Sequence, residues 1–439
     1  MDTKARRSAT TAQRWVLGLT ATASLMVALD ILVVTTALST IRRDLGASVE
    51  ALEWTVNAYS LSFAVLLMTG AALGDRFGRR RLFATGLGLF SVASAACALA
   101  GSIGWLVAAR AVQGIAAALV MPLALTLLSA AFPAEQRGRA LGIFSGVTGL
   151  AVLGGPLLGG AVTQGIAWEW IFWLNVPIGL LAIPLVLRRI EESFGPSKAV
   201  DLPGLGLLSG AAFGVVWGLV RGNTAGWGSV EVLTALAGGA LLAAGFVGWE
   251  RRAAAPMLPP RLFRARAFAS GNASAFFLFA ALYGAVFFMA QLLQVGLGYG
   301  PLGTGLRLLP WTATLFLVAP VAGALVDRVG ERPFMAGGLF LQAVGMAWMG
   351  LVAKPGLEYA SIVPAMVVAG CGVSMMMPAA QNSVLGSVAP YEIGKASGTF
   401  NMLRQLGGVF GVAVLVAVFA RNGGYASART FIDGFGPAT

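Results

Sequence analysis

Long apolar runs separated by short polar segments form the main pattern of this sequence. Runs of about 20 apolar residues are long enough to cross a hydrocarbon core of roughly 30 Å as helices. The pattern predicts about thirteen spans, near residues 14–38, 53–74, 81–100, 104–131, 138–164, 168–187, 203–221, 229–249, 268–294, 301–326, 333–352, 359–380 and 395–420. The tail 421–439 lacks a continuous apolar run. We therefore expect an all-α polytopic membrane protein.

Composition supports a membrane protein and excludes an ordinary soluble enzyme. Hydrophobic residues make up 57% and charged residues 11% of the chain, about half the charged share of a typical soluble domain. The net charge of +12 is spread over many short loops, which indicates topology signals and not a nucleic-acid surface. With the N-terminus inside, basic residues favour the inner loops by roughly three to one. We expect a multi-pass plasma (cytoplasmic) membrane protein with a cytoplasmic N-terminus.

The most charged loop, residues 70–81 (GAALGDRFGRRR), follows the second predicted span. Asp75 can accept hydrogen bonds from a helix N-terminus and pair with a nearby arginine, which would latch two halves of the molecule together on the cytoplasmic side. A simple topology anchor is the alternative, because positive loops remain on that side in any case.

The second half of the sequence repeats features of the first. The loop 322–332 (AGALVDRVGER) resembles the loop 70–81, and five residues recur at an offset of about 256 positions. They are Gly114, Met121, Pro122, Gly138 and Gly142, matched by Gly370, Met377, Pro378, Gly394 and Gly398. Parallel repeats of this kind predict two bundles with a substrate path at their interface. We expect six-helix-type bundles at 1–190 and 267–439, related by a pseudo-two-fold axis, with two additional linker spans within 191–266.

One acidic residue, Asp30, is predicted to lie deep in a span, where an ionisable group is costly and usually functional. At 1.5 Å per residue, Asp30 and Arg110 reach similar depths in the first and fourth spans. We expect them to face each other, directly or through Gln113 and water, with Asn57 and Tyr59 at a similar level. Protonation of Asp30 would release Arg110 and couple a proton to a conformational change. A static ion pair is the alternative.

Two further arginines, Arg307 and Arg404, lie inside predicted spans without an acidic partner in their half. Such cations are expected to face water or an anionic group, and the Met375–Met377 run can supply an adaptable apolar surface. The candidates for a substrate cavity are Asn57, Tyr59, Gln113, Gln294, Arg307, Gln381, Asn401, Arg404 and Gln405, with Gln291 and Asn382 as further polar lining.

Several chemistries are unsupported by the sequence. It has no His and no clustered acids for a metal site, and no nucleotide-binding GxxxxGK[ST] motif. Cys97 and Cys371 lie far apart in apolar runs, which does not suggest a disulfide framework. We expect a protein that is not an enzyme and uses no cofactor beyond the proton gradient. Its expected partners are a small-molecule substrate and the lipid bilayer, without nucleic acid, and a monomer is the expected state.

Taken together, these stretches resemble the major facilitator superfamily, and more narrowly its fourteen-span drug:proton antiporter family of multidrug exporters. The motifs that carry the resemblance are ALDILVVTTALSTI (28–41), LEWTVNAYSLSFA (52–64), AALGDRFGRRR, RAVQG with Pro122, VLGGPLLGG (152–160), WEWIFWLNVPIG (168–179), LQVGLGYGPLGTGLRLLP (293–310) and NMLRQLGGVFGVA (401–413). Their order and spacing make the resemblance specific over nearly the whole chain.

The resemblance implies proton-coupled efflux of small amphiphilic drugs or antibiotics by alternating access. It assigns a cytoplasmic gate to Gly74, Asp75, Arg76, Gly78 and Arg79, with Asp327 and Arg328 as a weaker counterpart in the second half. It also associates the fifth span with export, through Gly154, Gly155, Pro156, Gly159 and Gly160. Small residues let helices approach closely and Pro kinks a helix, so a packing role alone is the alternative.

The sequence departs from the family pattern in three places. Ala71 and Ala151 replace glycines of the loop and antiporter motifs, and the family's last span is missing. Two other functions are therefore kept open: a dedicated exporter of one metabolite, and a non-transporting or inactive truncated membrane protein of a sensor-like kind.

Overall fold

The computed structural model describes residues 10–195, 200–354, 356–389 and 392–438, and its regular elements in this part of the chain are helices. The first bundle contains α1 (Thr11–Asp44), α2 (Val49–Phe77), α3 (Arg79–Ala98), α4 (Ile103–Ala131), α5 (Ala134–Gly165), α6 (Trp170–Trp173) and α7 (Asn175–Arg189). A hairpin of α8 (Leu202–Ala225) and α9 (Val230–Glu250) follows. The second bundle contains η1 (Pro260–Arg264), α10 (Arg266–Gln291), η2 (Leu292–Gly296), α11 (Pro301–Arg307), α12 (Leu309–Thr312), α13 (Thr314–Val329), α14 (Glu331–Val352), α15 (Tyr359–Gly386), α16 (Ile393–Asn422) and α17 (Ala428–Ala438).

The described helices confirm the predicted membrane spans. Twelve segments are long and apolar enough to cross a bilayer, and α5 makes a thirteenth when its two parts, bent by 42° against each other, are counted as one. Short helices combine within single spans: α6 with α7, α10 with η2, and α11 with α12 and α13. The terminal helix α17 has 11 residues, too few to cross a hydrocarbon core. The prediction of an all-α polytopic membrane protein is therefore correct.

The repeat predicted from the sequence has a physical counterpart in helix packing. A Cβ atom on Gly114 of α4 would lie 2.2 Å from the carbonyl oxygen of Tyr59. A Cβ on Gly370 of α15 would lie 2.7 Å from the carbonyl oxygen of Trp311. Each glycine thus lets its helix contact the backbone of a neighbouring span in its own half. These equivalent close approaches explain why glycine stands at both position 114 and position 370.

The two halves are joined mainly at one end of the molecule. At the end that carries the α1–α2 connection, a single hydrophobic core contains Leu38 and Ile41 of α1 together with Phe288 of α10 and Trp311 of α12. At the opposite end, which carries the α2–α3 connection, each half has a core of its own. The halves therefore share their core at the α1–α2 end, as expected for one of the two states of an alternating-access protein.

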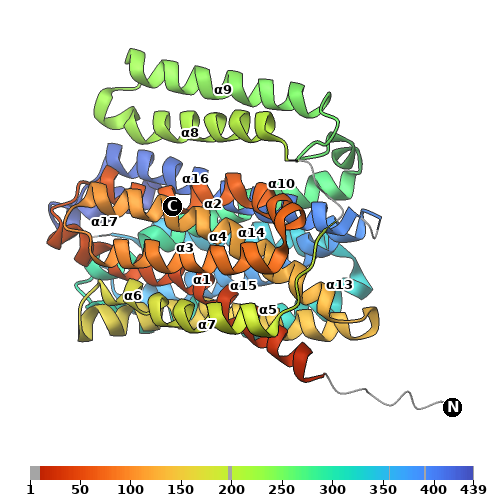
Figure 1. Ribbon diagram of the computed structural model, residues 1–439. Coiled ribbons are helices and arrows are strands. Elements are labelled where there is room, and N and C mark those ends of the chain that lie inside the picture. The colour runs from red at the N-terminus through yellow and green to blue at the C-terminus, as the bar shows by residue number, and fades with distance from the viewer. Residues whose placement is uncertain (1–9, 196–199, 355, 390–391, 439) are drawn as a thin grey trace.

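The α8–α9 hairpin lies at the edge of the bundles (Figure 1). Helix α8 packs across the boundary between the halves, where Val216 shares a hydrophobic cluster with Leu61 of α2 and Met402 of α16. Arg221 of α8 binds Glu231 of α9 at 3.0 Å and Glu50 of α2 at 3.4 Å. The hairpin is thus attached to both halves, although α9 packs mainly on α8.

The segment that follows α7 packs against the α2–α3 connection and forms hydrogen bonds with it. Gly78 adopts φ = +107°, a conformation that favours glycine, between the two helices. The carboxylate of Glu192 accepts hydrogen bonds from the backbone N–H groups of Arg80 at 2.8 Å and Arg81 at 3.3 Å. Since the first N–H groups of a helix have no partner inside it, Glu192 acts as an N-terminal cap for α3 supplied from elsewhere in the chain.

Replacing Gly411 by Ala is expected to destabilise the second bundle. A Cβ there would lie 2.0 Å from the carbonyl oxygen of Ala280, so α16 and α10 must separate, at a cost of about 1–3 kcal/mol. Thermal unfolding of the purified protein measures the change. Gly238→Ala in α9 is the matched control, because no described atom lies within 4 Å of its added Cβ. Equal stability of the two variants would contradict the packing.

Replacing Glu192 by Ala is expected to weaken the start of α3. Loss of a helix cap lowers the free energy of unfolding by about 0.5–2 kcal/mol, and the α2–α3 connection should become more sensitive to added protease. The neighbouring Glu191→Ala is the control, because Glu191 is exposed. If both variants behave alike, Glu192 does not act as the cap.

Candidate functional site

A buried ion pair between Asp30 and Arg110 lies inside the first bundle. Nη1 of Arg110 in α4 donates to Oδ2 of Asp30 in α1, and the two side chains are only 2% and 1% exposed. The structure therefore brings together in direct contact the two residues that the sequence placed at equal depth. Two charges buried at this level are costly unless each one is compensated by the other and by further hydrogen bonds.

Two more polar side chains complete the contacts of Asp30, and Ser94 lies behind them. Nε2 of Gln113 donates to Oδ1 of Asp30 at 2.8 Å and to the hydroxyl of Ser94 at 2.8 Å. Nδ2 of Asn175, at the start of α7, donates to the same Asp30 oxygen at 3.1 Å. The carboxylate is thus held by donors from α4 and α7, and the Ser94 hydroxyl of α3 accepts a hydrogen bond from each of them. Side chains from four helices meet at this single group.

The guanidinium of Arg110 is held as firmly as its partner. Its Nε donates to the carbonyl oxygen of Thr55 in α2 at 3.1 Å, and Nη1 also donates to Oε1 of Gln113 at 2.6 Å. The Tyr59 ring lies under it, with the Cζ atom 4.2 Å from the ring centre, and Phe172 lies 5.8 Å away. Such contacts favour a desolvated cation. Arg110 therefore connects α1, α2 and the α6 segment through one charge.

A second buried acidic residue, Glu53, lies near the start of α2 and is not among the predicted site residues. Helix α2 begins at Val49, before the predicted start of the second span at residue 53, and Glu53 in its second turn is 0% exposed. One of its oxygens accepts a hydrogen bond from Asn57 at 3.0 Å. The start of a span is poorly marked in a hydrophobic pattern, and a carboxyl group at that point gives no signal of burial.

Ser94 and Asn175 were also missed among the residues of the Asp30 cluster. Both are polar residues within predicted spans, and Asn175 lies inside the stretch WEWIFWLNVPIG. Their polarity in an apolar run was the only available signal. Neutral polar residues in spans usually bond to their own helix, so this signal is weak without coordinates.

The predicted cavity residues of the second half fall into separate groups. In α16, Arg404 lies with its Cζ atom 5.1 Å from the Phe279 ring centre, and Gln405 accepts a hydrogen bond from the Tyr283 hydroxyl at 3.0 Å. Among the described residues Arg404 has no acidic partner. Asn401 donates to the Ser397 carbonyl of its own helix at 2.9 Å. This group lies near the middle of α16.

Three other cavity candidates lie elsewhere. Arg307 stacks on Tyr299, with its Cζ atom 3.6 Å from the ring centre. Gln294 donates to the carbonyl oxygen of Thr36 in the first half at 2.8 Å, which ties the two halves together at the α1–α2 end. Gln381 in α15 is exposed. The structure therefore does not bring all nine predicted cavity residues into one cluster.

The predicted gate residues contact their own half. Asp75 binds Arg79 at 2.8 Å, and the carbonyl oxygen of Asp75 accepts a hydrogen bond from the N–H of Gly195 at 3.1 Å. A Cβ on Gly74 would lie 2.1 Å from a Leu123 methyl, while the Arg76 Cζ atom lies 5.1 Å from the Phe77 ring centre. In this structure Asp75 therefore links α2 to the segment that follows α7.

The second-half counterpart of the gate is only partly described. Arg328, in the last turn of α13, is exposed. The side chain of Asp327 lies outside the described residues.

The glycines of α5 lie at contacts with both halves. A Cβ on Gly155 would lie 2.6 Å from Leu32 of α1, and one on Gly159 would lie 2.6 Å from the carbonyl oxygen of Val33. A Cβ on Gly160 would lie 2.3 Å from the carbonyl oxygen of Pro301 in α11. The carbonyl of Pro156 approaches Gly305 of α11 in the same way, whereas Gly154 lies nearest to Leu158 of its own helix. Helix α5 is thus a direct contact between the bundles.

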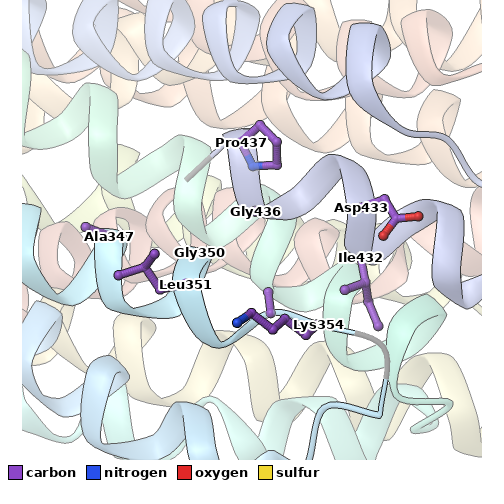
Figure 2. A pocket seen from close by; sticks show the side chains of 9 residues that line it. Ala347, Gly350, Leu351, Lys354, Ile432, Asp433, Gly436 and Pro437 are labelled. Carbon is purple, nitrogen blue, oxygen red and sulfur yellow. The ribbon is translucent and has the colours of Figure 1, made fainter.

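An open pocket lies between α14 and α17, and its lining does not include Asp30, Arg110 or the residues bonded to them. Its lining includes Leu351, Lys354, Ile432, Asp433 and Pro437 (Figure 2). In that view the ammonium group of Lys354 and the carboxylate of Asp433 point apart. The described residues contain no group of His, Cys, Asp and Glu side chains that could hold a metal ion, and Cys97 and Cys371 are free thiols.

Comparison with known proteins identifies the fold and the family. The family model described as Major Facilitator Superfamily matches residues 20–412. The chain is 37% identical over 404 residues to the tetracenomycin C resistance and export protein of Streptomyces glaucescens, covering 91% of this chain and 74% of that protein. It is 36% identical over 397 residues to the multidrug resistance protein Stp of Mycobacterium tuberculosis, covering 90% and 74%.

Solved structures agree on the fold. A peptide transporter, POT, in complex with sulfate superposes with a TM-score of 0.68 at 15% identity, over 97% of this chain and 91% of the other. The chain is therefore a multi-pass membrane transport protein, not an enzyme, and it belongs to the Major Facilitator Superfamily.

Proposed function

We propose that this protein exports small amphiphilic drugs or antibiotics from the cytoplasm in exchange for protons, by alternating access. The relatives named for antibiotic export and multidrug resistance support the direction and the substrate class. The observation that carries the proton coupling is the buried pair of Asp30 and Arg110.

A proton on Asp30 would change the energy of this arrangement. The protonated carboxyl no longer compensates the charge of Arg110, and leaving one member of a buried pair uncompensated costs about 3–5 kcal/mol. The guanidinium then gains by moving toward water or toward another acceptor. Because Arg110 also holds Thr55 of α2 and lies against Tyr59, its movement acts on the packing of two neighbouring helices. Protonation thus favours the other arrangement of the bundles.

In this proposal the α2–α3 end faces the cytoplasm, as its basic residues favour. The halves are joined at the α1–α2 end, so this structure corresponds to the state that is closed to the outside. The moving parts are the bundles 1–190 and 267–439, which 191–266 connects. The close glycine contacts of α5 with α11 supply a surface on which the bundles can shift. In the other state, the gate around Asp75 would form its contacts with the second half.

The second bundle supplies the groups that suit an amphiphilic substrate. Arg404, Gln405 and Tyr283 offer polar groups near mid-membrane, and Phe279 offers an aromatic surface. A few placed polar groups within apolar and aromatic walls are typical of small-molecule sites. Of the predicted cavity residues, we therefore place Arg404 and Gln405 in contact with substrate, and assign Arg307 and Gln294 to the joined end.

Asp30→Asn is expected to abolish transport driven by a proton gradient, because Asn cannot carry a titratable proton. In inside-out vesicles containing the full chain, accumulation of substrate above its equilibrium level should be lost. Exchange of labelled for unlabelled substrate without a gradient should persist. Asp44→Asn, the same change at an exposed position of α1, is the control.

Two results would overturn the proposal. If Asp30→Asn accumulates substrate against a gradient like the wild type, Asp30 does not couple the proton. If the wild-type chain neither accumulates nor exchanges any of a panel of drugs, it is not a drug exporter. Transport of a single compound from the panel would instead favour a dedicated exporter, as the name of the tetracenomycin C relative suggests for that protein.

A further inference from the structure

Glu53 is a buried carboxyl group that forms no hydrogen bond or ion pair with Asp30 or Arg110. It lies in the second turn of α2 with a side chain that is fully inaccessible to solvent. Every ion pair found among the described residues involves other carboxylates, so Glu53 has no cationic partner there. An isolated ionised carboxylate in a membrane protein core is strongly unfavourable, and such a group normally takes up a proton instead.

Two acceptor oxygens at Glu53 and Asn57 have no hydrogen-bond donor among the described residues. Oε1 of Glu53 accepts a bond from Nδ2 of Asn57 at 3.0 Å. Oε2 of Glu53 and Oδ1 of Asn57 are both buried and lack a partner among the described residues. A proton on Oε2 would supply the donor that these two acceptors need. A protonated carboxyl and a primary amide can then form two parallel hydrogen bonds, one in each direction.

The surrounding charged and titratable groups do not provide a counter-ion for Glu53. Glu50, one turn earlier, is of like charge and is already paired with Arg221 of α8. From α4, Arg110 is used by Asp30 and by the Thr55 carbonyl. From the connection after α16, Tyr425 donates to Gln291 and lies under the guanidinium of Arg42 from α1. Arg110 is thus bonded to other groups. Arg42 contacts the Tyr425 ring and forms no ion pair with Glu53, although its Nε has no hydrogen-bond partner among the described residues.

We propose that Glu53 is a second proton-binding site, distinct from Asp30, and that it holds a proton in the arrangement in which the α1–α2 end is closed. Its use in transport rests on the proposed proton-coupled function. Opening of that end would admit water to the first turns of α2, where an ionised carboxylate is well solvated. Closing the end removes the water and favours uptake of a proton on Oε2, so lower pH favours the closed arrangement.

Infrared spectroscopy of the full-length protein in lipid tests the site without any transport measurement. The carbonyl stretch of a protonated carboxyl is separate from the bands of carboxylates. At neutral pH, the spectrum of the wild type minus that of Glu53→Gln should contain one protonated carboxyl band. Glu50→Gln should leave this band in place, because Glu50 is paired with Arg221 and does not contact Asn57. Gln is nearly isosteric with a protonated Glu and can donate to Asn57, so the variant is expected to fold.

Thermal stability over a range of pH gives a second reading. A proton held in the folded state stabilises it at low pH, and this contribution is lost as pH rises through the pKa of the group in the folded protein. The wild type should therefore lose more stability than Glu53→Gln as pH rises from mildly acidic to alkaline values. Glu50→Gln should follow the wild type.

The outcomes separate this site from the proposed function. A difference spectrum with a carboxylate band and no protonated carboxyl band would overturn the second site, even if Asp30→Asn loses coupling as expected. A protonated band that disappears in Glu53→Gln supports the site, even if vesicles show no exchange of drug for protons. Equal pH dependence of stability in the wild type and Glu53→Gln would also count against it.

Discussion

The arrangement of the first bundle depends on one buried charge pair. Asp30 and Arg110 are almost completely removed from water, and each is stable there only because the other is present. The groups that complete their hydrogen bonds come from α2, α3, α4 and α7. Helix positions that would otherwise be set by apolar packing alone are thereby fixed by directional contacts. A change in charge at one atom consequently affects several helices at once.

The contact between the bundles has a different character from the interior of the first bundle. Where α5 meets α11 of the second bundle, Gly160 and Gly305 lie against backbone carbonyls of the facing helix, without charged side chains in those contacts. Without a hydrophobic driving force in lipid, such interfaces depend on close van der Waals packing. In the proposed alternating access, directional polar contacts within a bundle and uncharged contacts between bundles would together allow each bundle to move as a unit. The hydrogen bond from Gln294 to Thr36 is an exception at the joined end.

The sequence predicted the spans, the repeat and the depth of Asp30 and Arg110, because hydrophobic length and the rise of a helix are local properties. It could not predict which way a side chain points around its helix. For that reason the cavity set combined Gln294, which bonds to α1, with Arg404 near the centre of α16. Helix ends were also uncertain by several residues. The second span was predicted to begin at residue 53, whereas α2 begins at Val49, so the burial of Glu53 inside the helix was not predicted. The carbonyl oxygen of Asp75 accepts a hydrogen bond from Gly195, in the segment after α7. No local sequence pattern specifies the course of that segment, so this contact could not be predicted.

The two buried carboxyl groups differ in a way that follows from their surroundings. Asp30 has a guanidinium and two amide donors, whereas Glu53 has one amide donor and an oxygen without a partner among the described residues. They are nevertheless connected, because Arg110 donates to the carbonyl of Thr55, two residues beyond Glu53 on α2. If Arg110 leaves Asp30, the same movement releases this turn of α2. In the proposed mechanism, hydration at Glu53 and the charge state of Asp30 would therefore be linked through one backbone carbonyl, and a proton bound at either carboxyl would change the affinity for a proton at the other.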